Sequence, residues 1–168
     1  MENIKYKIGH LRDKKDLEIL ATEYAKLYNN SVLQEKWTPE LAKKLFEYFY
    51  DLNPKLFCVA YCEERPVGAI MSVIKPWWDG MHLEDTEIFV AKDYQKQGIG
   101  TDLYKYHYKI ATEEFGATVM EAHTYADENG YPLNWYRKLG FEVVDDWKVI
   151  NGNIKEILER MNKNGRNI

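Results

Sequence analysis

One stretch near the middle of the chain constrains its fold more than any other. Residues 88–91 are apolar, a polar turn follows, and Gly98 and Gly100 come at the end of that turn. The stretch predicts a strand, a tight turn and a helix in direct succession. The apolar residues after the turn are spaced by four, three and four positions, as in a helix with one buried face: Ile99, Leu103, Tyr106 and Ile110.

The predicted turn has the features of an anion-binding site. The first N–H groups of a helix have no partner within the helix, and the helix dipole adds positive potential there. Gly98 and Gly100 would let a ligand approach the backbone closely. The turn lacks the Lys-Ser/Thr ending of a P-loop, and Leu103 stands where G-x-G-x-x-G needs its third glycine. A tight turn without a ligand is an equally good interpretation of these glycines alone.

A family resemblance favours the anion site. The segment Gln95-Lys96-Gln97-Gly98-Ile99-Gly100 resembles the Q/R-x-x-G-x-G/A signature of the GNAT superfamily, the acyl-CoA-dependent N-acetyltransferases. Residues 129–141 resemble the N-x-x-A-x-x-x-Y-x-x-x-G-F block of that family, with Pro132 in the alanine position. The two motifs occur in the family's order and together cover about residues 80–145.

The resemblance implies a fold and a cosubstrate. We expect one α/β (α+β) domain over residues 1–168, with a core at about 4–161 and a frayed tail at 162–168. Its mixed, mostly antiparallel central sheet would be flanked by helices, and a splayed pair of central strands would hold acetyl-CoA; no metal is expected. The residues assigned to CoA binding by the resemblance are Phe89, Val90, Ala91, Gln95, Lys96, Gln97, Gly98, Ile99, Gly100, Thr101, Asn129 and Tyr136.

The remaining elements follow from periodicity and capping signals. Asp13 and Thr38 are expected to cap two helices, Asn153 a third, and Gly116 to end the helix after the glycine turn. The buried stripe of the second helix is expected to contain Leu41, Leu45, Tyr48, Phe49 and Leu52. Strands are expected at residues 4–8, 56–61, 67–74, 81–91, 117–124, 141–144 and 147–150, and a short helix between Pro132 and Gly140.

The expected reaction is direct attack of an amine on the acetyl thioester. An alkylamine with a pKa near 10 is protonated at neutral pH, so a base must remove a proton and the thiolate must gain one. Tyr136 matches the family's tyrosine that serves as general acid. Glu87 is the nearer candidate base and Glu84 lies one step back, but a β-bulge would change which acid faces inward. A water chain to either acid and a proton relay through His123 are alternatives, although a lone strand histidine is more often structural.

The acceptor is not readable from the sequence. Tyr28 and Trp37 belong to the connection between the first two helices, which helps to build the acceptor pocket in the family. Trp77 and Trp78 are adjacent in a predicted turn and would form a lid beside that pocket, or pack on the helices. The acceptor is expected to be a small-molecule amine or a peptide or protein amino group. The alternative to an enzyme is a GNAT-fold module that binds acyl-CoA without turnover.

Composition excludes several other classes. The chain has 168 residues and a formal charge of −4, so no basic field suggests a nucleic-acid partner. No apolar run has the length of a membrane span and no secretory segment is apparent, so a cytoplasmic location is expected. Cys58 and Cys62 are expected to be buried free thiols rather than a disulfide or a metal site. A homodimer is compatible with the sequence.

Overall fold

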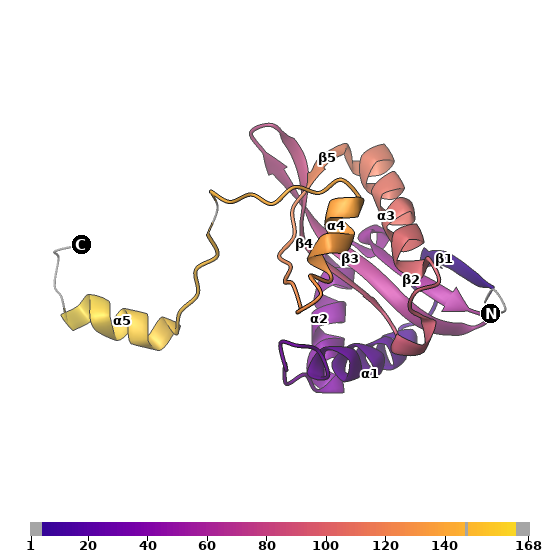
Figure 1. Ribbon diagram of the computed structural model, residues 1–168, viewed down its shortest axis with the longest axis horizontal. Helices are drawn as coiled ribbons and strands as arrows, with labels where there is room; N and C mark the ends of the chain where they lie inside the picture. The colour runs from indigo at the N-terminus through magenta and orange to yellow at the C-terminus, as the bar shows by residue number, and fades with distance from the viewer. Residues whose placement is uncertain (1–4, 147, 164–168) are drawn as a thin grey trace. The chain divides into compact units, whose positions relative to one another are not determined.

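The computed structural model describes residues 5–146 and 148–163, so Ile4 and Trp147 of the expected strands lie outside the described residues. The chain divides into two compact units, Met1–Thr124 and Tyr125–Ile168. The first unit contains β1 (Tyr6–His10), α1 (Asp16–Asn29), α2 (Pro39–Leu52), η1 (Pro54–Leu56), β2 (Phe57–Cys62), β3 (Arg65–Trp77), β4 (Gly80–Val90), η2 (Lys92–Tyr94), α3 (Ile99–Phe115) and β5 (Ala117–Met120) (Figure 1). The second unit contains α4 (Leu133–Lys138) and α5 (Ile154–Lys163).

The first unit is built on a five-stranded sheet in the order β1-β2-β3-β4-β5. Every neighbouring pair is antiparallel except β4 and β5, which are parallel. The β4–β5 ladder is short: it ends at Leu83 and Met120, followed by one bond from the Glu121 amide to the Leu83 carbonyl at 2.9 Å. Among the described residues, β4 has no partner strand on its β5 side from Glu84 onward. The expected mixed, mostly antiparallel sheet is confirmed, and one edge of β4 is open.

Helices cover both faces of this sheet, with α1 and α2 on one face and α3 on the other (Figure 1). Strand residues alternate between the two faces. Met71 and Phe89 therefore pack into the cluster under α1 and α2. Ser72, the next residue after Met71, points to the other face and hydrogen-bonds His107 of α3. The buried residues of the α1–α2 side are Leu17, Leu20, Ala21, Tyr24, Ala42, Phe46, Phe49, Phe57, Val59, Tyr61, Ala69, Met71 and Phe89.

The buried stripe expected for α2 is largely wrong. Ala42, Phe46 and Phe49 are buried, whereas Leu41, Tyr48 and Leu52 are more than half exposed. The helix has apolar residues on two adjacent faces, and only packing against α1 and the sheet selects which face is covered. The helix start is as expected, since Thr38 Oγ1 accepts the amide of Leu41 at 3.2 Å.

Two further boundaries differ from the sequence-based expectation. Asp13 caps a turn rather than α1: its carboxylate accepts the Lys15 amide, and α1 begins at Asp16. The strand after α3 ends at Met120 instead of residue 124 because β4 and β5 separate there. At the other end of α3, Gly116 takes the left-handed conformation expected of a C-cap, with φ +66°.

The second unit lacks the strands expected at residues 141–144 and 148–150. A strand needs a partner for its backbone groups, and the only β-bridge described in this unit joins Ala126 and Pro132. The expected helices are present: α4 follows Pro132, and Asn153 Oδ1 accepts the amides that begin α5. No helix among the described residues is long and apolar enough to cross a membrane.

Candidate functional site

A β-bulge in β4 decides where its acidic side chains point. Met71 of β3 pairs with Glu87, and Val73 pairs with Glu84. A step of two residues along β3 therefore corresponds to a step of three residues along β4. Residues two apart on a strand share a face and paired residues share a face, so Glu84 and Glu87 project to the same side of the sheet. The extra residue is accommodated at Asp85, whose φ is +48°.

The bulge is held from the α3 side by a buried polar chain. Thr86 Oγ1 and Ser72 Oγ are 2.8 Å apart, and Ser72 Oγ lies 2.8 Å from His107 Nε2. His107 Nδ1 lies 3.7 Å from Cys58 Sγ, so one of the two thiols has a histidine neighbour that the sequence did not indicate. Burial lowers the pKa of His107 to about 4 and raises the pKa of Cys58 to about 12, so both groups are neutral near pH 7.

Glu87 is the acid with the perturbed environment. Burial raises the pKa of Glu87 above its usual range, and the nearby carboxylates of Glu35 and Asp85 raise it further. Tyr24 opposes this effect, since its hydroxyl donates a hydrogen bond to Glu87 Oε2 at 3.1 Å. The pKa of Tyr24 is itself raised, mainly by burial and then by the charge of Glu87. A carboxyl group with a raised pKa at a pocket is a candidate general base.

Glu87 lines a pocket of about 250 Å³. One wall is formed by apolar side chains of α2, and the other by the bulge of β4 with the segment after β5. The lining residues are Leu45, Tyr48, Phe49, Asp85, Thr86, Glu87 and His123. The pocket therefore combines apolar surface with two carboxylates, which suits a cationic group carried on an apolar body.

Glu84 has a different environment. Both of its carboxylate oxygens accept from Lys75 Nζ, at 2.9 and 3.0 Å, and it is not among the residues that line the pocket. The two candidate bases therefore differ in their contacts. Glu87 accepts a hydrogen bond from the Tyr24 hydroxyl and lines the pocket, whereas Glu84 is paired with the Lys75 ammonium group.

The glycine turn has the geometry of an uncapped helix N-terminus. Lys96 and Gly98 both have left-handed backbones, with φ +62° and +86°. The first amide bonded within α3 is that of Asp102, to the Gly98 carbonyl at 3.0 Å, so the three helical amides before it have no partner in the helix. The Asp102 carboxylate accepts a hydrogen bond from Tyr6 Oη at 2.7 Å, and this hydrogen bond raises the pKa of Tyr6 to about 12.

The open edge of β4 runs into this turn. The Ala91 amide donates to the Val67 carbonyl of the β3 side at 2.8 Å, so Phe89 and Ala91 direct their backbone groups toward β3. Ile88 and Val90 direct theirs to the open side, where the Ile88 carbonyl accepts from Tyr28 Oη and the Val90 carbonyl from Gln95 Nε2. Of residues 89–91, only Val90 can offer its amide to a ligand on that side.

The four aromatic acceptor candidates divide into two groups. Tyr28 and Trp37 are partly buried and pack against the core beside Tyr24, with ring centroids 4.3 and 5.3 Å from its ring. Trp77 and Trp78 lie at the β3–β4 hairpin tip, 42% and 86% exposed. None of the four is among the residues lining the pocket at Glu87. Sequence reasoning did not connect Tyr24 with the site, because an apolar-facing tyrosine in a helix is typical of a core residue. Nothing in the sequence shows where a bulge falls.

The second unit contains the remaining two candidates. Asn129 lies in a turn in which Asp127 Oδ1 accepts the amides of Asn129 and Tyr131, both at 2.8 Å. Tyr136 lies in α4, with its ring edge-on to Phe141 at 5.3 Å between centroids. The local structure agrees with the turn and short helix expected from the sequence.

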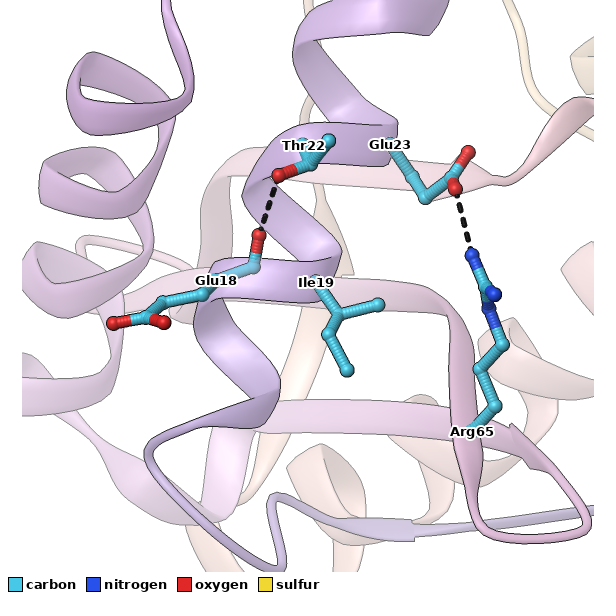
Figure 2. Close-up of a pocket in the computed structure, with 5 residues that line it drawn as sticks. All are labelled: Glu18, Ile19, Thr22, Glu23 and Arg65. Carbon is cyan, nitrogen blue, oxygen red and sulfur yellow. Dashed lines mark hydrogen bonds and ion pairs between the residues drawn. The ribbon is translucent and has the colours of Figure 1, made fainter.

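A second depression, of about 350 Å³, lies on the outer side of α1. Figure 2 shows that Arg65 reaches Glu23 there, with Nη2 and Oε1 2.9 Å apart, while Thr22 donates to the Glu18 carbonyl at 2.8 Å. These polar groups already have partners within the depression, and the Glu18 carboxylate is paired with Lys43, which lowers the pKa of Glu18. This depression carries no sign of chemistry.

Residues 22–141 match the model of the acetyltransferase (GNAT) family. The chain belongs to the GNAT acetyltransferase family. No curated protein sequence gives a significant match to it. Its fold is that of solved GNAT structures, among them a possible acetyltransferase from Clostridium difficile 630, with a TM-score of 0.71 and 18% identity over 89% of this chain and 97% of that chain.

Two other similar GNAT structures differ in their acceptors. An aminoglycoside acetyltransferase from an uncultured soil metagenomic sample has a TM-score of 0.62 and 17% identity, over 89% of this chain and 97% of that chain. Arabidopsis thaliana Naa50, in complex with the bisubstrate analogue CoA-Ac-MVNAL, has a TM-score of 0.55 and 17% identity, over 83% and 85%. The family thus includes proteins for small molecules and for peptides, and the similarity at this identity concerns the fold.

Proposed function

We propose that this GNAT protein transfers the acetyl group of acetyl-CoA to a primary amine by direct attack. The observation that carries the proposal is the bulge of β4, which brings Glu87 into a pocket beside the open edge of the same strand. The acceptor has a cationic amine on an apolar body, because the pocket lining combines Asp85 and Glu87 with side chains of α2.

Two features of the first unit support acetyl-CoA as the cosubstrate. The uncapped amides of Ile99, Gly100 and Thr101 would bind the pyrophosphate, together with the loop of Gln95, Lys96, Gln97 and Gly98. The Val90 amide on the open edge would bond the pantetheine arm as an added strand does. The side chain of Gln95 stabilises the backbone at Val90, since its Nε2 donates to the Val90 carbonyl at 2.9 Å.

Glu87 would act as the general base. Its raised pKa brings the carboxylate closer to the working pH, where a base is most effective. The amine nitrogen attacks the thioester carbonyl carbon and gives one proton to Glu87, directly or through water. The C–S bond then breaks, and the departing CoA thiolate takes a proton, for which Tyr136 is the proposed donor. Asn129 is proposed as a further CoA contact.

The test is thiol release from acetyl-CoA in the presence of a panel of amines. Wild-type protein should turn over with at least one amine, and Glu87→Gln should reduce kcat by about 10²–10⁴-fold near neutral pH. Glu114→Gln, at an exposed acid paired with Lys55, is the control for loss of a carboxylate. Binding of acetyl-CoA without thiol release for any amine would favour a non-catalytic acyl-CoA-binding module, and a rate loss in Glu84→Gln alone would transfer the base role to Glu84.

A further inference from the structure

Three side chains converge where the β4–β5 ladder ends. His82 pairs with Val119 in this parallel ladder, and paired residues project to the same face. Glu84 is two residues beyond His82 and Glu121 is two residues beyond Val119, so all three lie on one face at the point where the strands separate. Their ligand atoms all lie within 4.8 Å of one another.

His82 directs an unpartnered nitrogen into this cluster. The residue is 3% exposed, and its Nε2 lies 2.9 Å from Asp79 Oδ1. A carboxylate only accepts hydrogen bonds, so the proton of a neutral His82 is on Nε2 and Nδ1 carries a lone pair. Nδ1 is buried with no hydrogen-bond partner among the described residues, and Glu121 Oε1 lies 3.7 Å from it. A buried lone pair that faces a half-exposed carboxylate oxygen at this distance is unfavourable unless a positive charge lies between the two atoms.

The charges around the cluster are unbalanced. The carboxylates of Asp79, Glu84 and Glu121 face one ammonium group, that of Lys75. Lys75 Nζ is bound to Glu84 and lies 4.4 Å from the centre of the Trp77 ring. Among the described residues, Glu84 is its ion-pair partner, and Lys75 forms no ion pair with Glu121. Three carboxylates and one ammonium group leave an excess of two negative charges, and a divalent cation would balance them.

We propose that His82, Glu84 and Glu121 bind one divalent transition-metal ion of the Zn²⁺ type, at the fork between β4 and β5. An imidazole nitrogen with two carboxylate oxygens is a ligand set that Zn²⁺ accepts, and three protein ligands leave a position for water. Ligands at about 2.0–2.2 Å from a tetrahedral ion are about 3.3–3.6 Å apart, close to the separation of His82 Nδ1 and Glu121 Oε1. Asp79 fixes the ring of His82 from behind, as outer carboxylates do at zinc sites.

The ion would join the two strands at the end of their ladder. His82 and Glu84 come from β4, and Glu121 follows β5 directly. Glu121 and Glu84 are partly exposed, so an ion can enter from solvent, whereas His82 is buried. The site is distinct from the pocket at Glu87, and the proposal does not depend on the acetyltransferase activity.

The experiment is titration of the chelator-treated full chain with Co²⁺, followed by its visible absorption and by equilibrium dialysis, with displacement by Zn²⁺. One ion per chain should bind, and Glu121→Gln and His82→Gln should each weaken binding at least ten-fold. Glu121 is half exposed, so Glu121→Gln tests the site even where His82→Gln fails to fold. Glu114→Gln is the matched control and should bind as the wild type does.

Two results would overturn the metal site. One is the absence of Co²⁺ binding by the wild type at millimolar concentration, which would mean that the three side chains do not form a metal site. The other is binding that Glu121→Gln and Glu114→Gln leave equally strong, which would locate the ion elsewhere.

Discussion

Removing the hydroxyl of Tyr24 should make Glu87 hold its proton more tightly. The hydroxyl donates to Glu87 Oε2 and so favours the charged carboxylate, against the burial that disfavours it. In Tyr24→Phe, only the raising influences remain: burial, then Glu35 and Asp85. The pKa of Glu87 should therefore rise further above its usual range, while the aromatic packing around residue 24 is kept.

The size of the effect follows from the hydrogen-bond geometry. A hydrogen bond to a charged group contributes about 1.5–3 kcal/mol. The observed separation of 3.1 Å is long for two oxygen atoms. We therefore take the lower end, about 1.5 kcal/mol, which corresponds to about ten-fold tighter proton binding by Glu87 in the variant.

The assay is an NMR titration of protein labelled with ¹³C at the glutamate carboxyl carbons. Glu87→Gln identifies the signal, and no acceptor amine is needed. Tyr61→Phe is the matched control, because it removes another core hydroxyl, one that bonds Asp16 and not Glu87. A Glu87 titration midpoint that is unchanged in Tyr24→Phe, or that moves to lower pH, would refute the reasoning. If Glu87 is also the catalytic base, the acidic limb of kcat/KM should move in the same direction.

Three other predictions concern the cofactor turn, the general acid and stability. Gly98→Val should abolish acetyl-CoA binding in isothermal titration, whereas Gly116→Val, with a similarly left-handed backbone at the other end of α3, should keep it; equal affinities would end the phosphate-site proposal. Tyr136→Phe should lower kcat by about 10²–10⁴-fold with little change in acetyl-CoA affinity, and an unchanged kcat would assign proton donation elsewhere. Because burial raises the pKa of Glu87, its ionisation destabilises the fold as pH rises above the usual carboxyl range. Glu87→Gln should therefore raise Tm at neutral pH, with a gain that shrinks toward pH 4.5; a constant or negative difference would contradict this.

The sequence by itself determined the features that depend on neighbours in the chain. The Thr38 cap, the Gly116 C-cap and the strand–turn–helix around Gly98 each require only a few consecutive residues, and all three are as expected. The hairpin of β2 and β3 also follows from two short strand patterns with a polar turn between them, whereas the mixed sheet was implied by the family resemblance. The family motif in the glycine turn was readable for the same reason, since its function depends on local backbone geometry.

Only the tertiary structure decided which side chains meet across the sheet. Glu87 and Tyr24 are 63 positions apart, and their contact depends on a bulge whose presence is fixed by the register of β4 against β3. Packing likewise selected the buried face of α2. The convergence of His82 with Glu121 depends on where β4 and β5 separate. In a strand, one inserted residue reverses the face of every side chain that follows, and no local propensity reports that insertion.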